Sequence, residues 1–135
     1  ELYRVKRATL DADSDLAVAV GVMAENHQAY AQAISGATGL GAADAAQSIV
    51  DEGRAAFGGS DDEFFAAAHV LEQTLVATHV EALAAYDSSD AISLTTSILV
   101  IEARHATVLA DLLGVNQSSI LFGNDQSALS LSGAE

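Results

Sequence analysis

The chain contains no cysteine, no proline and no tryptophan, and only 5% of its residues are aromatic. Without cysteine, disulfides, thiolate metal sites and cysteine nucleophiles are excluded. Without proline, and with alanine supplying much of the hydrophobic half of the chain, long close-packed helices are favoured over sheets. The 135 residues suffice for one domain that buries roughly two-thirds of its unfolded surface. The composition predicts an all-α protein.

Basic residues are also scarce. Five lysines and arginines face 19 aspartates and glutamates, which gives a net charge of −14. Three of the five, Arg4, Lys6 and Arg7, lie at the N-terminus, where they suit the negative end of a helix dipole. The rest of the chain has little to neutralise phosphates, so nucleic-acid binding is not expected. The acidity with a single lysine indicates a high-salt or marine source, or simply solubility through self-repulsion.

Long hydrophobic runs are missing as well. No apolar stretch reaches the roughly 18 to 20 residues of a membrane span without polar interruption, so no transmembrane segment is expected. No signal peptide is visible within the sequence, which opens at Glu1. The absence of cysteine is compatible with either side of a membrane. We expect that the N-terminus was processed or that an upstream segment precedes it.

Hydrophobic periodicity predicts three long helices, over residues 13–35, 61–86 and 91–114. Residues 1–8 have the pattern of the last two turns of a helix whose beginning is missing. The connection 37–60 contains a short helix over about 42–57 and is long enough to cross a bundle. Serines and aspartates at 11–15, 60–61 and 87–90 supply N-caps. Residues 115–135 form a polar tail that must dock on something to be ordered.

A weak internal repeat relates residues 13–36 to residues 91–114 at an offset of 78. His27 then matches His105, and Gly36 matches Gly114. Both copies follow an acidic turn that contains serine. The repeat predicts two helical hairpins joined by a crossover, with part of the first helix absent.

Five ionisable residues lie on otherwise apolar helix faces, where a lone charge is costly: His27, Glu72, His79, Glu102 and His105. Glu102 and His105 are three residues apart and therefore adjacent on one face. Carboxylate and imidazole ligands suit iron, manganese or zinc. His79 lies about 10 Å along the axis from Glu72, so a hydrogen-bonding role is favoured for it. Alternatively, Glu102 bridges to His27 or His79 in a polar network that fixes helix register.

Counting the truncated helix at 1–8 as the first of a bundle, Glu72 lies in the third helix (61–86) and the EARH run at 102–105 in the fourth (91–114). On these residues the chain resembles the ferritin-like domain proteins over residues 1–114, with 115–135 as a separate tail. This resemblance implies an up-down four-helix bundle with a short crossover helix and a truncated first helix. It also implies a metal site in which Glu72 is the third-helix ligand and Glu102 and His105 are the fourth-helix pair. His27 takes the second-helix histidine position.

The family resemblance implies a site for two metal ions, and the sequence departs from the family pattern at half of the ligands of that site. Ala24 stands where the second helix would give a glutamate, Glu25 is one residue out of phase, and the first-helix position lies outside the sequence. A mononuclear or a vestigial site fits what is left, with iron or manganese as the cofactor, or none. The alternative is a metal-free bundle that serves as a structural or interaction subunit, as a homo-oligomer or with another protein. Exported members of the family favour an extracytoplasmic location.

Overall fold

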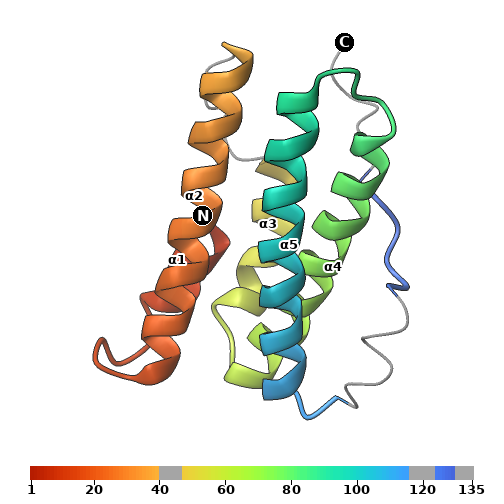
Figure 1. Cartoon of the computed structure of the whole chain (residues 1–135). Helices are drawn as coiled ribbons and strands as arrows, with labels where there is room; N and C mark the ends of the chain where they lie inside the picture. Colours follow the sequence, from red (N-terminus) through yellow and green to blue (C-terminus); the bar gives the residue numbers. More distant parts are fainter. Residues whose placement is uncertain (40–46, 116–123, 130–135) are drawn as a thin grey trace. The chain divides into compact units, whose positions relative to one another are not determined.

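The computed structural model describes residues 1–39, 47–115 and 124–129, and in these ranges it is helical without any strand. The described helices are α1 (Leu2–Arg7), α2 (Asp15–Thr38), α3 (Gln47–Phe57), α4 (Asp61–Leu83) and α5 (Ser89–Leu112) (Figure 1). The predicted all-α class is confirmed. The predicted helices over 13–35, 61–86 and 91–114 correspond to α2, α4 and α5 within about three residues at each end.

Serine hydroxyls fix where the long helices begin. Ser14 Oγ accepts a hydrogen bond from the Ala17 amide at 3.1 Å, and Ser88 Oγ accepts one from the Ala91 amide at 3.3 Å. α2 ends at Gly39, whose φ of 69° is a left-handed conformation that glycine adopts without strain. The sequence predicts the end of this helix near residue 35, four residues before Gly39.

α4 begins with a reciprocal capping box. The Glu63 carboxylate accepts hydrogen bonds from the amide of Ser60 at 2.8 Å and from its hydroxyl at 2.7 Å, while the Glu63 amide donates to Ser60 Oγ at 3.3 Å. These hydrogen bonds, those to the side chain of Ser60 first, lower the pKa of Glu63. The ionised carboxylate is therefore part of the cap.

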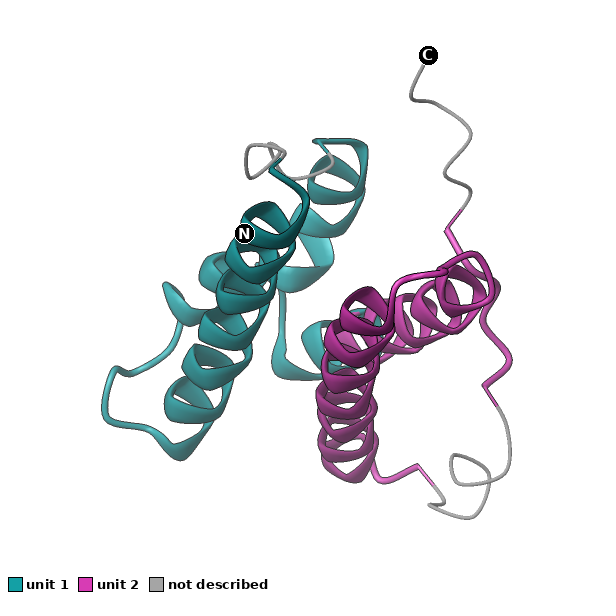
Figure 2. Ribbon diagram, turned by 45° about the horizontal axis from the view of Figure 1, so that its top comes forward, with its two compact units in different colours: residues 1–67 teal, residues 68–135 magenta. Residues whose placement is uncertain are grey.

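The chain divides into two compact units, residues 1–67 and residues 68–135 (Figure 2). The first contains α1, α2, α3 and the opening turns of α4. The second contains the rest of α4 together with α5 and the C-terminal segment. Each unit is described by itself.

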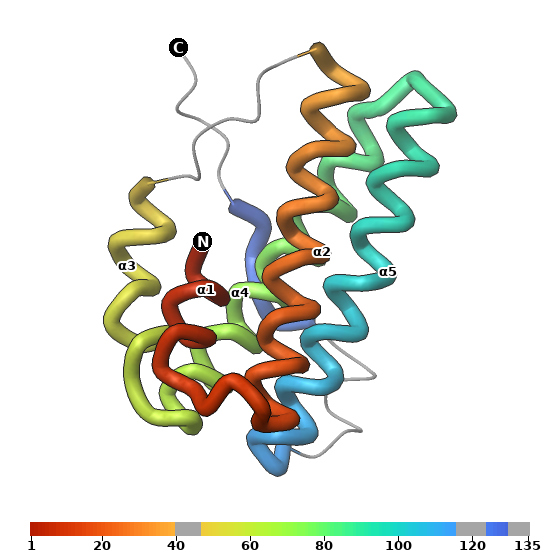
Figure 3. Tube along the Cα trace, turned by 90° about the vertical axis from the view of Figure 1, so that its left-hand side faces the viewer, coloured from red at the N-terminus to blue at the C-terminus, as the bar shows by residue number. Residues whose placement is uncertain are grey.

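Aromatic rings form the core of the first unit. Within it, α1 lies beside both α2 and α3 (Figure 3). Tyr3, Phe57 and Phe64 are buried and meet edge to face, with ring centroids 5.3–6.0 Å apart. Gly53 of α3 lies against Leu2 of α1, and an added Cβ at Gly53 would lie 2.7 Å from a methyl carbon of Leu2. The unit is thus held by rings from α1, α3 and α4.

Lys6 is buried in the same unit, at 2% exposure. It lies in the last turn of α1, as expected from the helix dipole. Its ammonium also donates to the carbonyl of Gly59 at 3.1 Å, pairs with Asp61 at 2.7 Å and lies 5.3 Å from the centre of the Phe64 ring. The single lysine therefore fastens α1 to the start of α4, a contact that the sequence alone does not indicate.

The second unit is built on the hairpin of α4 and α5 (Figure 1). Its buried apolar side chains are small or aliphatic: Ala68, Ile98, Ala106, Leu109 and Ala110. Residues 124–129 lie against α4, because Asn124 donates to the carbonyl of Gln73 at 2.7 Å and the Leu129 amide donates to Thr78 Oγ1 at 2.9 Å. This part of the predicted tail contacts α4, while 116–123 and 130–135 lie outside the described residues.

α5 is long and apolar enough, by length and composition alone, to be a weak candidate for a membrane span. Its most apolar window has a mean hydropathy of 1.2, and a third of that window is buried. The core helix of a bundle passes the same test, and α5 carries the buried Glu102 and His105 at its centre. No described helix is a clear transmembrane segment.

Candidate metal centre

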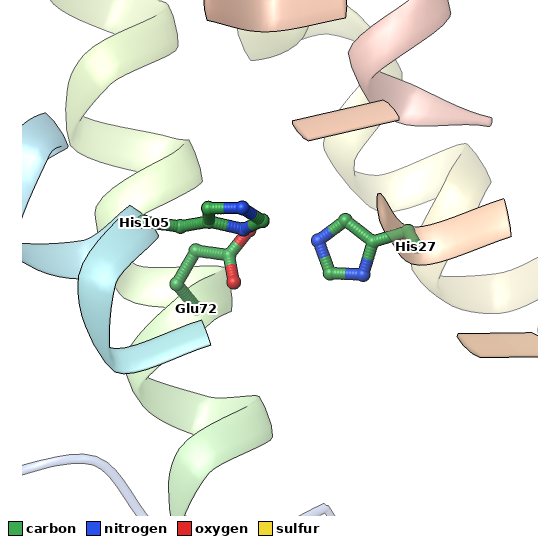
Figure 4. A group of neighbouring side chains, drawn as sticks. All are labelled: His27, Glu72 and His105. Atoms are coloured by element: carbon green, nitrogen blue, oxygen red, sulfur yellow. The ribbon is translucent and has the colours of Figure 1, made fainter. Parts of the chain in front are cut away.

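Glu72 of α4 and His105 of α5 face each other within the second unit. Neither is accessible, with 0% of the Glu72 side chain and 8% of the His105 side chain exposed. His105 Nδ1 lies 3.4 Å from Glu72 Oε1, which is longer than a strong charge-assisted hydrogen bond. Figure 4 shows the two side chains converging from their helices. A buried carboxylate and an imidazole therefore meet in a contact that is close without being tight.

His79 and Glu102 form a second pair in the same hairpin. His79 Nδ1 lies 2.7 Å from Glu102 Oε2, the length of a strong hydrogen bond. Glu102 is 2% exposed and His79 is 19% exposed, so the carboxylate is shielded and the imidazole reaches toward solvent. The sequence left either His27 or His79 as the partner of Glu102, and the structure shows a hydrogen bond between Glu102 and His79.

The two pairs are reciprocal. α4 contributes Glu72 and His79, while α5 contributes His105 and Glu102, so each helix gives one carboxylate and one imidazole. Both contacts cross the hairpin and therefore tie the register of α4 to that of α5. Burying two carboxylates in this way is costly unless each is paired, and here each has an imidazole beside it.

The donor set of the hairpin fits a transition-metal ion. Carboxylate oxygen and imidazole nitrogen are the protein ligands preferred by iron, manganese and zinc. Glu72 and Glu102 are buried among apolar side chains, where a carboxylate gains more from a cation than it would in water. The hairpin therefore offers protein ligands that such an ion can use.

The predicted site residues fall into both units. Glu72, Glu102 and His105 belong to the second, and His27, also drawn in Figure 4, belongs to α2 of the first. The His27 ring stacks on Tyr3 with centroids 5.3 Å apart and meets Tyr30 edge to face at 6.3 Å. Glu25 is exposed, as its position on the helix predicts. Aromatic neighbours therefore hold the imidazole of His27.

Sequence reasoning missed His69, which lies on α4 one turn before Glu72. Its Nε2 atom is buried and has no hydrogen-bond partner among the residues that the structure describes. Burial lowers the pKa of His69, which favours the neutral ring. The signal was the spacing of His69 and Glu72, which is the spacing of Glu102 and His105 in reverse order.

The two helices that carry the internal repeat start at a different offset from the one that the sequence repeat gives. α2 and α5 both have 24 residues and begin at Asp15 and Ser89, which are 74 positions apart, four fewer than the sequence offset of 78. The difference is about one helical turn. The match of His27 with His105 is therefore a match of side-chain pattern rather than of position from the helix start.

Comparison with known protein families identifies the ferritin-like domain. Residues 4–115 match the ferritin-like domain, which covers most of the chain, including every residue of the two Glu–His pairs. No curated protein and no solved structure matches the chain.

Proposed function

Because the chain belongs to the ferritin-like domain family, we propose that it binds iron or a similar transition metal between its helices. The proposed ligands are Glu72, Glu102, His105 and His27. When bound, an iron or manganese ion supplies redox chemistry with dioxygen or peroxide. The protein supplies the ligands, a buried apolar surround and the exclusion of bulk water.

The contact between Glu72 and His105 carries the proposal. A carboxylate that is 0% exposed is unusual unless a cation or a strong hydrogen bond stabilises it. Glu72 Oε1 lies 3.4 Å from His105 Nδ1, so a carboxylate oxygen and an imidazole nitrogen lie close to each other in the hairpin. A metal ion bound to both side chains would further stabilise the buried carboxylate, because carboxylate oxygen and imidazole nitrogen are ligands that iron, manganese and zinc accept.

Glu102 takes part through its second oxygen. A carboxylate has two oxygens with about four lone-pair sites, so it can hold His79 with one oxygen and a cation with the other. The hydrogen bond from His79 to Oε2 would orient Glu102 and fix how its other oxygen is presented. His79 is then a positioning residue for a ligand.

His27 is proposed from chemistry and sequence pattern. His27 lies on α2 of the first unit and offers an imidazole nitrogen, a ligand atom that such ions accept. His27 matches His105 in the internal repeat and takes the second-helix position of the family pattern. Tyr3 and Tyr30 restrict its ring, and a restricted ring loses less entropy when it binds an ion.

The metal content of protein purified without chelators tests the proposal. Elemental mass spectrometry should find about one equivalent or more of iron, manganese or zinc in the full chain. Glu72→Ala and His105→Ala should each lose most of it, because half of the central pair is gone. Glu81→Ala is the matched control, since Glu81 is an exposed carboxylate on the same helix. Equal sub-stoichiometric metal in all four proteins would refute metal binding.

A metal-free bundle that serves as a structural or interaction subunit is the second candidate. The strong hydrogen bond between His79 and Glu102 favours it, because it satisfies a buried carboxylate without any ion. Under this function, the pairs are a polar network that sets the register of the hairpin. Full stability in the presence of a chelator, with no metal-dependent change, would be expected.

A further inference from the structure

One side of α5 is exposed and rich in aliphatic side chains. Glu102 and His105 turn toward α4, where each contacts a residue of that helix. Another side of α5 carries Val100, Val108 and Leu112, which are 44–46% exposed. Their spacings of eight and four residues place these three on one face of the helix. Exposed aliphatic residues that gather on one face indicate a contact surface.

Two charged residues lie on the same face. Arg104 and Asp111 are both exposed and are seven residues apart, so they are two turns, about 10 Å, from each other along the axis. Arg104 is the only lysine or arginine in residues 68–135 of a chain whose net charge is −14. In the part of the chain that the structure describes, no ion pair joins it to an acidic side chain. A cation without an acidic partner in its own chain therefore lies among the exposed valines.

A second copy of the chain has the complementary pattern. In two antiparallel helices related by a twofold axis, residue i opposes the partner's residue j, and j opposes the partner's i. If Arg104 opposes the partner's Asp111, then Asp111 opposes the partner's Arg104, which gives two ion pairs. The axis then passes between Thr107 and Val108, so the two copies of Val108 lie near each other at the centre. One arrangement thus matches both the charges and the apolar residues.

The same two charges disfavour a membrane as the occupant of this face. α5 is only a weak candidate for a membrane span, and an arginine and an aspartate are costly in lipid. Between two copies, each charge instead meets an opposite one. Because the chain as a whole is strongly acidic, copies repel each other wherever such local complementarity is missing.

We propose that the outer face of α5, formed by Val100, Arg104, Val108, Asp111 and Leu112, is an antiparallel homodimer interface in which each Arg104 pairs with the partner's Asp111. A contact made by one helix pair is at the small end of protein interfaces, below about 1,200 Å², and such contacts are weak and reversible. The interface uses neither Glu–His pair of the hairpin. It therefore goes beyond the proposed function and is independent of it.

Sedimentation equilibrium of the full chain tests the proposal, with excess chelator to exclude metal bridges between copies. The parent should dimerise reversibly between micromolar and millimolar concentrations. Arg104→Asp and Asp111→Arg should each weaken dimerisation by about 10-fold or more, because like charges then oppose each other twice. The double variant Arg104→Asp/Asp111→Arg should dimerise as the parent does, since exchanging the charges restores both ion pairs. An equimolar mixture of the two single variants should form a heterodimer for the same reason.

The two single variants separate the local ion pairs from the effect of net charge. Arg104→Asp makes the chain more acidic and Asp111→Arg makes it less acidic. General repulsion would therefore weaken dimerisation in the first and strengthen it in the second, whereas the proposed interface weakens in both. Glu81→Arg changes the net charge as Asp111→Arg does, at an exposed position of α4, and should not weaken the dimer.

Val108→Asp tests the apolar centre of the contact. It should abolish dimerisation over the same concentration range, because two carboxylates would meet near the axis. Val80→Asp is the matched control, since Val80 is a valine of α4 that is 55% exposed, and it should leave dimerisation unchanged. Circular dichroism of each variant checks that the helices remain. Should Val108→Asp fail to fold, the charge variants still decide the matter.

Three outcomes would overturn the proposal, and none of them bears on metal binding. The first is a parent that stays monomeric up to millimolar concentration. The second is a monomer that floats with phosphatidylcholine vesicles, because the face would then be a membrane surface. The third is a dimer whose affinity is the same in the parent and in both single charge variants, because another surface would then hold the copies together.

Discussion

The two compact units bury different kinds of side chain. The first places aromatic rings at its centre, and Lys6, the one buried charge among its described residues, has both a carbonyl and a carboxylate as partners. The second buries Glu72, Glu102 and His105, each with at most 6% of the whole residue exposed, together with alanine, isoleucine and leucine. Aromatic packing stabilises through apolar area, whereas buried carboxylates cost free energy unless their pairing is complete.

This difference indicates where function resides. In residues 1–67 the buried aromatic rings pack against one another, and Lys6 joins α1 to the start of α4. Packing alone therefore accounts for this core. Residues 68–135 keep a polar cluster where well-packed leucines would be at least as stable. Sites that break the local rules of a stable core are expected to be functional. Four predictions test the contrast, from the largest effect to the smallest.

Phe64→Ala should cause the largest loss of stability in the chain. Phe64 is fully buried and contacts the rings of Tyr3, Phe57 and Phe65. Removing a core phenylalanine typically costs about 3–5 kcal/mol in the free energy of unfolding. Urea unfolding followed by circular dichroism measures this. Val22→Ala, at a position that is 50% exposed, should change stability by less than about 0.5 kcal/mol.

His79→Ala should destabilise the metal-free protein by about 2–3 kcal/mol, because it leaves Glu102 buried without its hydrogen-bonding partner. The double variant His79→Leu/Glu102→Leu should recover this loss, since two apolar side chains replace the buried pair. Urea unfolding in excess chelator measures both. A double variant as unstable as the single one would show that the carboxylate is not the source of the loss.

His69 should make the metal-free protein less stable in mild acid. Its folded pKa is lowered by burial, so the unfolded chain binds the proton more readily. The neutral ring contributes its full stability above the unfolded pKa of about 6.5, and this contribution is lost as the pH falls through the folded pKa. His69→Gln should flatten the dependence of the melting temperature on pH below about 6.5 in excess chelator. The same dependence of melting temperature on pH in the parent and in His69→Gln would show that His69 does not cause the loss of stability in mild acid.

Glu63→Gln should have the smallest effect, confined to the start of α4. The Ser60 hydrogen bonds lower the folded pKa of Glu63, so its contribution is present above the unfolded pKa and is lost as the pH falls through the folded one. The side-chain amide of the variant keeps a hydrogen-bond acceptor and lacks the charge. The parent and the variant should therefore differ in melting temperature at neutral pH and converge in acid. A difference that persists at low pH would contradict a role for the charge.

Periodicity and caps predicted most of the fold. Ser14, Ser88 and Gly39 mark helix ends through local hydrogen bonds and backbone freedom, which depend on neighbours in sequence. The inward positions of Glu72, Glu102 and His105 follow from helical spacing and are buried as predicted. The predicted helix 91–114 is exposed near both ends, at Ile92 and Leu112, because a helix face is covered only along its packed length.

Pairing between helices could not be predicted in the same way. Whether Glu102 meets His27 or His79 depends on the register of α4 against α5, which no local pattern fixes. The burial of Lys6 depends on the path from Gly59 into α4, and its charge alone predicted only a helix-end position. His69 was within reach of sequence reasoning, because its spacing to Glu72 repeats a motif already recognised on α5.

The most direct test of metal binding by the hairpin is amide hydrogen exchange of the full chain, with and without saturating Co²⁺. Metal bound at 100 times its dissociation constant should stabilise the elements that hold it by about 2.7 kcal/mol. We predict slower exchange in the turns of α4 and α5 that carry Glu72 and Glu102–His105, and no change in α1 and α3. Equal exchange with and without the metal throughout α4 and α5, or slowing only at the exposed acidic residues 11–15 and 61–63, would contradict the account.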